Sequence, residues 1–409
     1  MRLEFGPILD DSDPPLPEGI VTESGRRTRS ADHLRETLSP YLADYGITRV
    51  ANLTGFDFVG LPVHMAVKPQ GRTLSSGSGK GSTINASWVS AVMEASEQSV
   101  WESAKFEKIQ ASRSNLQRMG LSVADGNDLP QQTSAIWHEE LPIDWTLGWD
   151  IVSGSSVWVP ESLASVSLRR TGNLDPFVSG SNGLASGAHV LEALLSGLQE
   201  VIERDGLVLR TMVNPAPHMT GDELLGRAAP TVWEKIQRSG LLLEVADVTT
   251  EIGVPIVAAY LHELEGGTTG SFKGMGAGVN IETALVRAVT EAAQARCLIV
   301  AGARDDMFET DRAASVQPAP RRATPQQSLT AGVDYSTGSV ATDIDWMVSQ
   351  LGKAGFHQVI VLRLSSPGDP VQVVRVIVPG LEGYPFQYTQ LGKRARHWKH
   401  SPPAERKSA

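Results

Sequence analysis

The sequence predicts an α/β or α+β protein, in which helices and strands alternate along the chain. Segments with apolar residues at helical spacing alternate with short segments rich in Val and Ile. In addition, three glycine-rich stretches each lie directly before a long helical segment. With 409 residues, of which 41% are hydrophobic, the chain is long enough to bury an ample core. The order of the strands does not follow from these patterns.

The individual elements are predicted from the spacing of apolar residues. In residues 31–45, apolar side chains recur every three or four positions after Ser30, which favours a helix with a serine cap. Alternating or continuous Val- and Ile-rich segments favour strands. The other predicted helices begin near residue 86 and cover residues 188–205, 283–301 and 344–354. The predicted strands cover residues 47–53, 62–68, 145–152, 156–159, 241–246, 256–261, 358–363 and 371–378.

Changes in composition divide the chain into three regions. Residues 1–70 form an N-terminal region whose first 25 residues are rich in Asp, Pro and Gly, and these are predicted to be irregular. Residues 71–392 form the main domain. Within it, residues 311–333 are rich in Pro, Ala and Gln without periodicity, which predicts a flexible connection. Residues 393–409 form a basic, Pro-containing tail, predicted to lie in solvent.

Composition also excludes several classes of protein. A net charge of -10 argues against nucleic-acid binding through a broad basic face. No apolar run is long enough for a membrane span, and the N-terminus lacks the pattern of a signal peptide. Cys297 is the only cysteine, so neither an internal disulfide nor a zinc site built from cysteines can form. We therefore expect a soluble, cytoplasmic protein with no membrane and no nucleic-acid partner.

The three glycine-rich stretches cover residues 77–82, 179–187 and 273–278. Glycine-rich loops at helix starts allow backbone N–H groups to approach anions. Polar residues three or four positions apart follow on each helix and share one face, and carboxylates in such a row can bind Mg²⁺. Together these features predict a metal and nucleotide site assembled from three helices. The rows are Ser90, Glu94 and Glu97 on the first helix, Glu200, Glu203 and Arg204 on the second, and Arg287, Glu291 and Gln294 on the third.

Each row alone has a simpler explanation as a solvated helix face. The second helix argues against this explanation, because apolar residues cover much of its circumference and a carboxylate on a buried helix must be paired. Two known phosphate loops are excluded. Around the first stretch, a P-loop would need Gly at position 74 and Ser or Thr at position 81, but the chain has Leu74 and Gly81. At the third stretch, Val279 stands where a dinucleotide loop has its last Gly.

The residues resemble those of the YcaO-domain family. Ser90, Glu94 and Glu97 match its Ser-x-x-x-Glu-x-x-Glu core, and the Asn182-Gly loop with Glu200-x-x-Glu-Arg204 matches a second motif. Arg287-x-x-x-Glu-x-x-Gln294 matches a third, and 378–382 a late strand and turn. The matches extend from about residue 47 to 382. Residues 46–62 and 301–306 are further similar to the subgroup of YcaO proteins that is associated with TfuA partners.

The resemblance implies a YcaO-type fold, with mixed sheets and three long helices around an ATP site. YcaO enzymes use ATP and Mg²⁺ to O-phosphorylate a backbone amide of a peptide or protein. A neighbouring Ser or Cys side chain then gives an azoline, whereas a sulfur donor gives a thioamide, the product associated with TfuA partners. The expected function is therefore thioamide formation on a ribosomally made precursor peptide or protein, with a TfuA-like partner.

The resemblance also implies roles for individual residues. Glu203, Arg204 and Arg287 are the expected catalytic residues. Lys80, just before the first helix, is an expected contact of phosphate or substrate. The expected Mg²⁺ ligands are Glu94, Glu97, Glu200, Glu203 and Glu291. The expected nucleotide-binding residues are Ser90, Asn182, Arg204, Arg287, Gln294 and Lys80.

Two departures from the family pattern bear on the product. Gln98 stands where many relatives have an Arg after the first Glu-x-x-Glu motif. The sequence ends in residues 401–409 without the Pro-x-Pro-x-Pro ending that is frequent in azoline-forming members, which favours an external nucleophile. Three alternatives stay open: an azoline-forming cyclodehydratase, a non-catalytic ATP-binding scaffold that recruits a peptide, and a dimetal hydrolase. The oligomeric state, with a homodimer as one option, is left open too.

Overall fold

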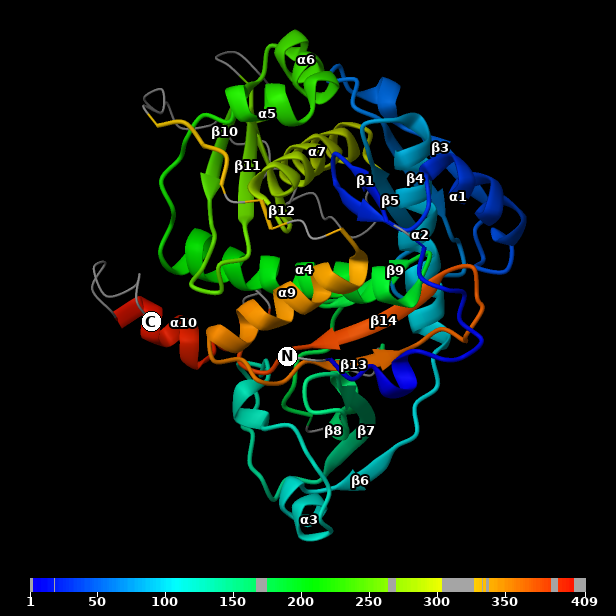
Figure 1. The fold of residues 1–409 in the computed structure, drawn as a ribbon, viewed down its shortest axis with the longest axis vertical. Helices are drawn as coiled ribbons and strands as arrows, with labels where there is room; N and C mark the ends of the chain where they lie inside the picture. The colour runs from blue at the N-terminus through cyan, green and yellow to red at the C-terminus, as the bar shows by residue number, and fades with distance from the viewer. Residues whose placement is uncertain are drawn as a thin grey trace.

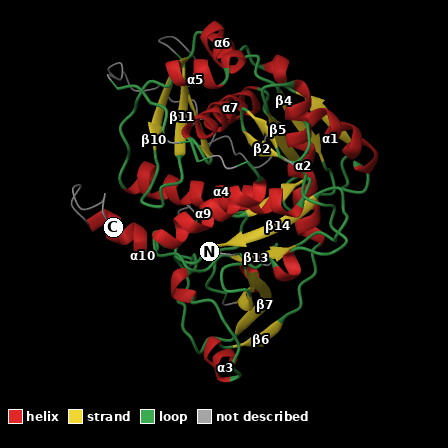
Figure 2. Ribbon diagram, viewed as in Figure 1, coloured by secondary structure: helices red, strands yellow, loops and turns green. Residues whose placement is uncertain are grey.

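Three sheets and three long helices surround the centre of the molecule, together with a small N-terminal hairpin, in a mixed α/β architecture that confirms the predicted class (Figures 1 and 2). The computed structural model describes most of the chain. The described residues are 3–17, 19–166, 175–263, 270–303, 327–332, 334–335, 338–383 and 389–400.

The first sheet is an antiparallel meander followed by a helix. Its strands are β3 (Arg49–Asn52), β4 (Val63–Val67) and β5 (Ser76–Lys80), in that order. Helix α2 (Ile84–Ser103) follows, and its Thr83 cap accepts a hydrogen bond from the Ala86 N–H. Because β3 and β4 pair with β5, residues 49–67 share a sheet with the start of the main domain.

The same arrangement recurs near the end of the chain. Strands β10 (Leu242–Asp247), β11 (Ile256–His262) and β12 (Ser271–Ala277) form a second antiparallel meander. Helix α7 (Ile281–Val300) follows, capped by Asn280. In both units the strand that precedes the helix is an edge strand of its sheet.

The largest sheet has six strands and again ends in an edge strand before a long helix. Its last strand, β9 (Leu184–Gly187), leads into helix α4 (Val190–Leu207), which continues as a π-helical segment, η6 (Val208–Val213). The strand order is β6 (Ile109–Ala111), β7 (Ile143–Asp150), β13 (Ile360–Arg363), β14 (Gln372–Ile377) and β9, with β8 (Ser155–Pro160) also paired to β7.

The three units close into a ring around the centre. Helix α2 contacts β9, α4 contacts β12, and α7 contacts β5, so each long helix touches its own strand and the edge strand of another unit. Smaller elements pack around these three units (Figure 1). They are β1 (Ile20–Thr22), β2 (Gly25–Arg27), α1 (Ala31–Leu38), α3 (Arg113–Arg118), α5 (Asp222–Ala228), α6 (Pro230–Ser239), α9 (Val340–Lys353) and α10 (Lys393–His400), with short 3-10 turns η1 (Gly6–Ile8), η2 (Ser39–Tyr41), η3 (Thr54–Phe56), η4 (Gly126–Asp128) and η5 (Glu161–Leu163).

The glycine-rich stretches are not the loops that the sequence predicts. Most of their glycines lie in strands β5, β9 and β12, against the helix that follows. A Cβ on Gly79 would lie 2.1 Å from the Ala91 N atom of α2, and one on Gly274 would lie 2.2 Å from the Ala288 O atom of α7. Glycine at these positions therefore allows the backbone of a strand to contact the backbone of a helix directly.

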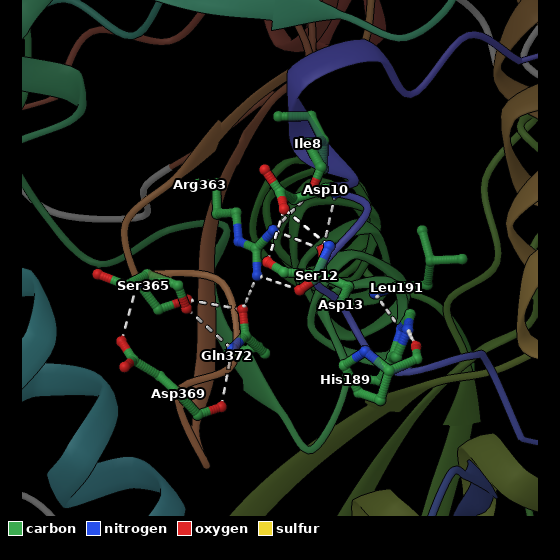
Figure 3. A network of polar contacts seen from close by, with 12 residues as sticks. Ile8, Asp10, Ser12, Asp13, His189, Leu191, Arg363, Ser365, Asp369 and Gln372 are labelled. Atoms are coloured by element: carbon green, nitrogen blue, oxygen red, sulfur yellow. Dashed lines mark hydrogen bonds and ion pairs between the residues drawn. The ribbon is translucent and has the colours of Figure 1, made fainter.

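The N-terminal segment is attached to the large sheet and to the start of α4. Arg363 of β13 donates to both carboxylate oxygens of Asp13 at 2.6 Å and to the Ile8 carbonyl (Figure 3). His189, the cap of α4, accepts from the Leu191 N–H and contacts the Pro14 carbonyl through Nε2 at 3.1 Å. These contacts give much of the segment that we predicted to be irregular a defined position at the first turn of α4.

Most predicted elements are present with small shifts in their ends. The helix predicted for residues 31–45 ends early as an α-helix at Leu38, because Pro40 follows and the chain continues as a 3-10 turn. The hairpin of β1 and β2 replaces part of the predicted irregular region. The predicted connection, residues 311–333, lies largely outside the described residues. None of the helices in the described part of the chain has both the length and the apolar composition of a membrane span.

The contact between β5 and α2 predicts a sharp difference between two glycine substitutions. We expect Gly79→Ala to lower the free energy of unfolding by about 1–3 kcal/mol or more, because the added methyl group meets backbone atoms that cannot rotate away. Gly55→Ala is the matched control, since nothing lies within 4 Å of its Cβ. Urea unfolding of both variants measures the difference, and equal stability of the two would contradict this account of the glycines.

Candidate functional site

A cavity of about 590 Å³ lies where the three long helices meet. Its walls come from all three units, because each edge strand brings one helix face to the centre of the ring. Most of the residues predicted for the site line this cavity, although they come from distant parts of the sequence. They are Lys80, Glu94, Glu97, Glu200, Glu203, Arg204, Arg287 and Glu291.

Backbone N–H groups of the edge strands hold two of the carboxylates. The Ser78 N–H of β5 donates to Glu94 Oε2 at 3.0 Å, and the Ala277 N–H of β12 donates to Glu203 Oε2 at 3.1 Å. The Met275 N–H, also on β12, lies 3.4 Å from an oxygen of Glu291. The N–H groups of the glycine-rich stretches thus bind protein carboxylates, whereas the sequence predicted that they would bind an anionic ligand.

A hydroxyl group holds another carboxylate. The Ser186 hydroxyl of β9 donates to Glu97 Oε2 at 2.8 Å, which joins α2 to the large sheet. Carboxylates from α2, α4 and α7 are therefore oriented by main-chain and side-chain donors before any ligand binds.

Basic side chains lie among the carboxylates. Lys80 Nζ is 2.6 Å from Glu291 Oε2, and Arg204 Nε is 4.0 Å from Glu200 Oε1. Arg287 donates from Nη1 to Gln199 Oε1 at 2.8 Å. Arg204 keeps 42% of its side-chain surface exposed, and this exposure leaves its guanidinium accessible to a ligand.

The nearby basic side chains do not compensate for the burial of several carboxylates, whose pKa values are raised. Burial raises the pKa of Glu200 to about 7, with Glu203 adding to the effect and Arg204 opposing it. Burial and the nearby Glu200 hold the pKa of Glu97 well above its usual range, and burial together with Glu291 raises the pKa of Glu203. A group of acids whose ionised forms are disfavoured in this way is stabilised when cations bind.

Glu291 and Arg287 complete this electrostatic picture. Burial alone would raise the pKa of Glu291, but the Lys80 ammonium group lowers it below its usual value. Burial lowers the pKa of the Arg287 guanidinium group, which nevertheless stays charged because its usual pKa is far above neutrality. The site therefore keeps at least one ionised carboxylate and a buried cation.

The residues fit Mg²⁺ that is bound together with a polyphosphate better than Mg²⁺ that is bound by the protein alone. Within the described residues, no three acidic, His or Cys side chains converge closely enough to hold a metal ion by themselves. Mg²⁺ prefers oxygen ligands and usually takes one or two carboxylates, with phosphates and water completing its shell. Scattered carboxylates around a cavity are the arrangement that this mode of binding requires.

Three of the predicted residues lie outside the lining of the cavity. Gln294 of α7 donates to the Ser78 hydroxyl of β5 at 3.0 Å and so links this helix to that strand. Asn182 lines a separate small cavity with Arg375. Ser90 lies on α2, half-buried, and is not part of the lining.

Three large apolar side chains also line the cavity. They are Leu74, Trp101 and Leu184. Trp101 follows Glu94 and Glu97 at helical spacing on α2, so the same periodicity that selected the carboxylates could have selected it. Leu74 carried no such signal, because it lies outside the long helices. Thr73, Gln98 and Ser196 are further lining residues that were missed. Leu184 and the remaining lining residues belong to the second glycine-rich stretch, which the sequence did predict as part of the site; they are Ser179, Gly180, Ser181, Ala185 and Ser186.

The start of the basic tail is not free in solvent, contrary to the prediction. It forms helix α10, and Arg394 makes ion pairs with Asp205 at the end of α4 and with Glu251. The carboxylate of Glu382 accepts the N–H groups of Gly392 and Ala395 near the start of this helix. The predicted tail therefore begins with a packed element, and residues 401–409 lie outside the described residues.

Comparison with known sequences gives relatives over most of the chain. The chain is 34% identical over 391 residues to a protein of Rhizobium leguminosarum bv. trifolii described as an uncharacterized protein in the tfuA 3′ region, covering 88% of this chain and 89% of that protein. It is 31% identical over 303 residues to the uncharacterized protein MT1419 of Mycobacterium tuberculosis, covering 73% and 67% of the two chains.

Solved structures share the fold. A YcaO protein from Methanopyrus kandleri, solved with AMPPCP and Mg²⁺, superposes with a TM-score of 0.67 at 22% identity over 89% of this chain and 95% of that one. A heterocyclase solved with substrate and cofactor superposes with a TM-score of 0.70 at 19% identity. This match covers 90% of the present chain but 54% of the heterocyclase, so the chain spans about half of that protein.

A family model matches residues 78–382, which include all three long helices, strands β9 and β12 and most of β5. The family is described as YcaO cyclodehydratases that bind ATP and Mg²⁺. These residues carry the motifs from which the sequence predicted the family and contain the carboxylates and cations around the cavity. The chain therefore belongs to the YcaO family.

Proposed function

We propose that this protein O-phosphorylates a backbone amide of a peptide or protein with ATP, and that a sulfur nucleophile then replaces the amide oxygen to give a thioamide. The observation that carries the proposal is the convergence of carboxylates from three helices, with Lys80, Arg204 and Arg287, on one cavity. Phosphoryl transfer requires mainly positioning and charge neutralisation, and this arrangement supplies both.

The lining of the cavity suggests how ATP lies in it. The apolar side chains of Leu74, Trp101 and Leu184 suit the adenine base. Glu203, Glu291 and the basic side chains lie on α4, α7 and β5 and suit the phosphates. The reacting phosphate then lies among charges from α4 and α7, and the peptide amide approaches these charges.

Five carboxylates are candidates to hold Mg²⁺ when ATP is bound, namely Glu94, Glu97, Glu200, Glu203 and Glu291. Bound Mg²⁺ would neutralise the phosphate charge that grows during transfer. The raised pKa values of Glu97, Glu200 and Glu203 support this assignment, since they mark carboxylates that need cations nearby.

The residues of the chain itself orient and neutralise the reacting groups. Arg287, held by Gln199, is placed to bind a phosphate oxygen, and the exposed Arg204 guanidinium to bind a second. In the step, the amide oxygen forms a bond to the terminal phosphorus, the bond from that phosphorus to ADP breaks, and ADP takes the electron pair. Phosphate leaves later, when the nucleophile has added to the amide carbon.

A TfuA-like protein is the proposed partner. The relative from Rhizobium leguminosarum, which is 34% identical over nearly its whole length, is described by its position beside tfuA. That position supports the thioamide product over the azoline product. The partner would bring or release the sulfur nucleophile, for which the cavity has no thiol of its own: Cys297 is buried, and burial raises its pKa to about 12.

The role of Arg287 predicts a large loss of activity without a loss of fold. We expect Arg287→Ala to lower ATP turnover, measured with the precursor peptide, on the order of 10²-fold or more, because a buried cation at the phosphates is lost. Arg238→Ala is the matched control, since this arginine is 79% exposed on α6. Unchanged turnover in a folded Arg287→Ala protein would rule out this role.

The electrostatics of Glu200 predict opposite effects on stability and on ligand binding. We expect Glu200→Gln to raise the unfolding midpoint of the ligand-free protein by about 2–4 °C and to weaken binding of Mg–ATP. A carboxyl group with a raised pKa contributes stability below its ordinary pKa of 4.5 and loses it as the pH rises through about 7. The advantage of the Gln variant should therefore be absent below pH 4.5 and greatest above pH 7.

Thermal unfolding in EDTA across this pH range, and calorimetry with Mg–AMPPCP, measure the two effects of Glu200→Gln. Glu234→Gln is the control, because Glu234 is 60% exposed and lies far from the cavity on α6. A Gln variant that is less stable at every pH would contradict the electrostatic explanation.

The mass of the modified peptide decides among the candidate functions. With ATP, a sulfur source and the partner present, we expect the mass to rise by the difference between sulfur and oxygen. Loss of one water would instead indicate an azoline-forming cyclodehydratase, which the family description favours. An unchanged peptide would indicate a scaffold, and cleavage without ATP would indicate a hydrolase. Intact-mass spectrometry of the precursor peptide gives the answer.

A further inference from the structure

Strand β12 carries a lysine that the proposed chemistry does not yet use. Lys273 begins the third glycine-rich stretch and lies two residues before Met275 on the strand. The N–H groups of Ala277 and Met275 point from the edge of β12 to Glu203 and Glu291. Residues two apart on a strand lie about 7 Å apart and share an orientation. Lys273 therefore occupies the next equivalent position on the same edge of β12.

The side chain of Lys273 lies on the face of β12 opposite α7. Gly274 and Gly276 face α7, so the alternate residues point to the other side, towards α4 and η6. There Lys273 Nζ donates to the Thr211 hydroxyl of η6 at 3.1 Å and lies 5.8 Å from the centre of the Tyr260 ring. The ammonium group is thus placed beside the end of α4, which carries Arg204.

The charge of Lys273 is not neutralised by an ion pair. Among the described residues, no carboxylate lies within ion-pair distance of its ammonium group, although the side chain is half-buried. Glu291 and Glu203 act on it from further away, and Arg204 opposes them. Burial lowers its pKa to about 8. A half-buried cation without an ion-pair partner is costly, and an anionic ligand would remove that cost.

Resting on the proposed function, we propose that Lys273 is a further substrate-binding residue, whose ammonium group binds the phosphoryl group after its transfer to the peptide amide. The ammonium group has three donors, and Thr211 is its only hydrogen-bond partner among the described residues. The remaining donors can turn to a phosphate at the edge of β12, since the lysine side chain has four rotatable bonds. Lys273 neither gains nor loses a proton in this role.

Inorganic phosphate is the probe for this site, because it is the product that the bound phosphoryl group becomes. The protein is first saturated with Mg–ADP, and phosphate is then titrated by calorimetry. We expect Lys273→Met to weaken phosphate binding at least about tenfold, because a charge-assisted hydrogen bond is lost, and to leave ADP binding unchanged. Lys273→Arg should retain most of the affinity. The control is Lys353→Met, whose lysine is exposed on α9.

A second variant separates this role from a structural one. If Lys273 serves only to hold η6 in place through its hydrogen bond to Thr211, then Thr211→Val should weaken phosphate binding as much as Lys273→Met does. Under the proposal, Thr211→Val retains phosphate binding. Equal phosphate affinity of wild type and Lys273→Met, or absence of phosphate binding to the Mg–ADP complex of the wild type, would overturn the inference. Failure of the wild type to bind Mg–ADP would instead overturn the proposed function.

Discussion

Direct backbone contact between strand and helix is the constraint on which the site depends. At Gly79 and Gly274 a single methyl group would lie 2.1 and 2.2 Å from helix backbone atoms, far inside van der Waals contact. Because the strand is so close, its edge N–H groups reach carboxylates on that helix, as at Glu94 and Glu291. Glycine therefore acts through packing: it brings the helix near enough for the strand to orient the acids. The same device at Gly187 brings β9 against α4.

The helices must be held firmly because the acids they present are buried and also repel one another. Glu97, Glu200 and Glu203 all have raised pKa values in the absence of cations, so their convergence costs stability. Such a cost persists only where the surrounding structure fixes the geometry. The ring of contacts from α2 to β9, α4 to β12 and α7 to β5 provides that restraint, since no helix can move away without losing contact with two strands.

Sequence patterns predicted the helices well and the edge strands poorly, for a physical reason. The faces of α2, α4 and α7 were predictable because carboxylates and arginines recur every three or four residues among apolar ones, and most of the residues selected line the cavity. Strands β5 and β12 were mistaken for loops, since glycine removes the β-branched side chains by which strands are usually identified. Trp101 shares the spacing of Glu97 but is uncharged, so a pattern of charged residues does not select it. The packing of α10 through Arg394 depends on Asp205, which lies far away in sequence.

Helix α4 is restrained at both ends by segments from the two ends of the described chain. Its first turn is capped by His189, which also contacts the Pro14 carbonyl, and its last turn carries Asp205, which pairs with Arg394 of α10. These contacts hold both ends of the helix that carries Glu200, Glu203 and Arg204. Because Asp205 directly follows Arg204, the ion pair with α10 lies one residue from a cation that lines the cavity. The terminal segments therefore complete the site, although neither lines the cavity.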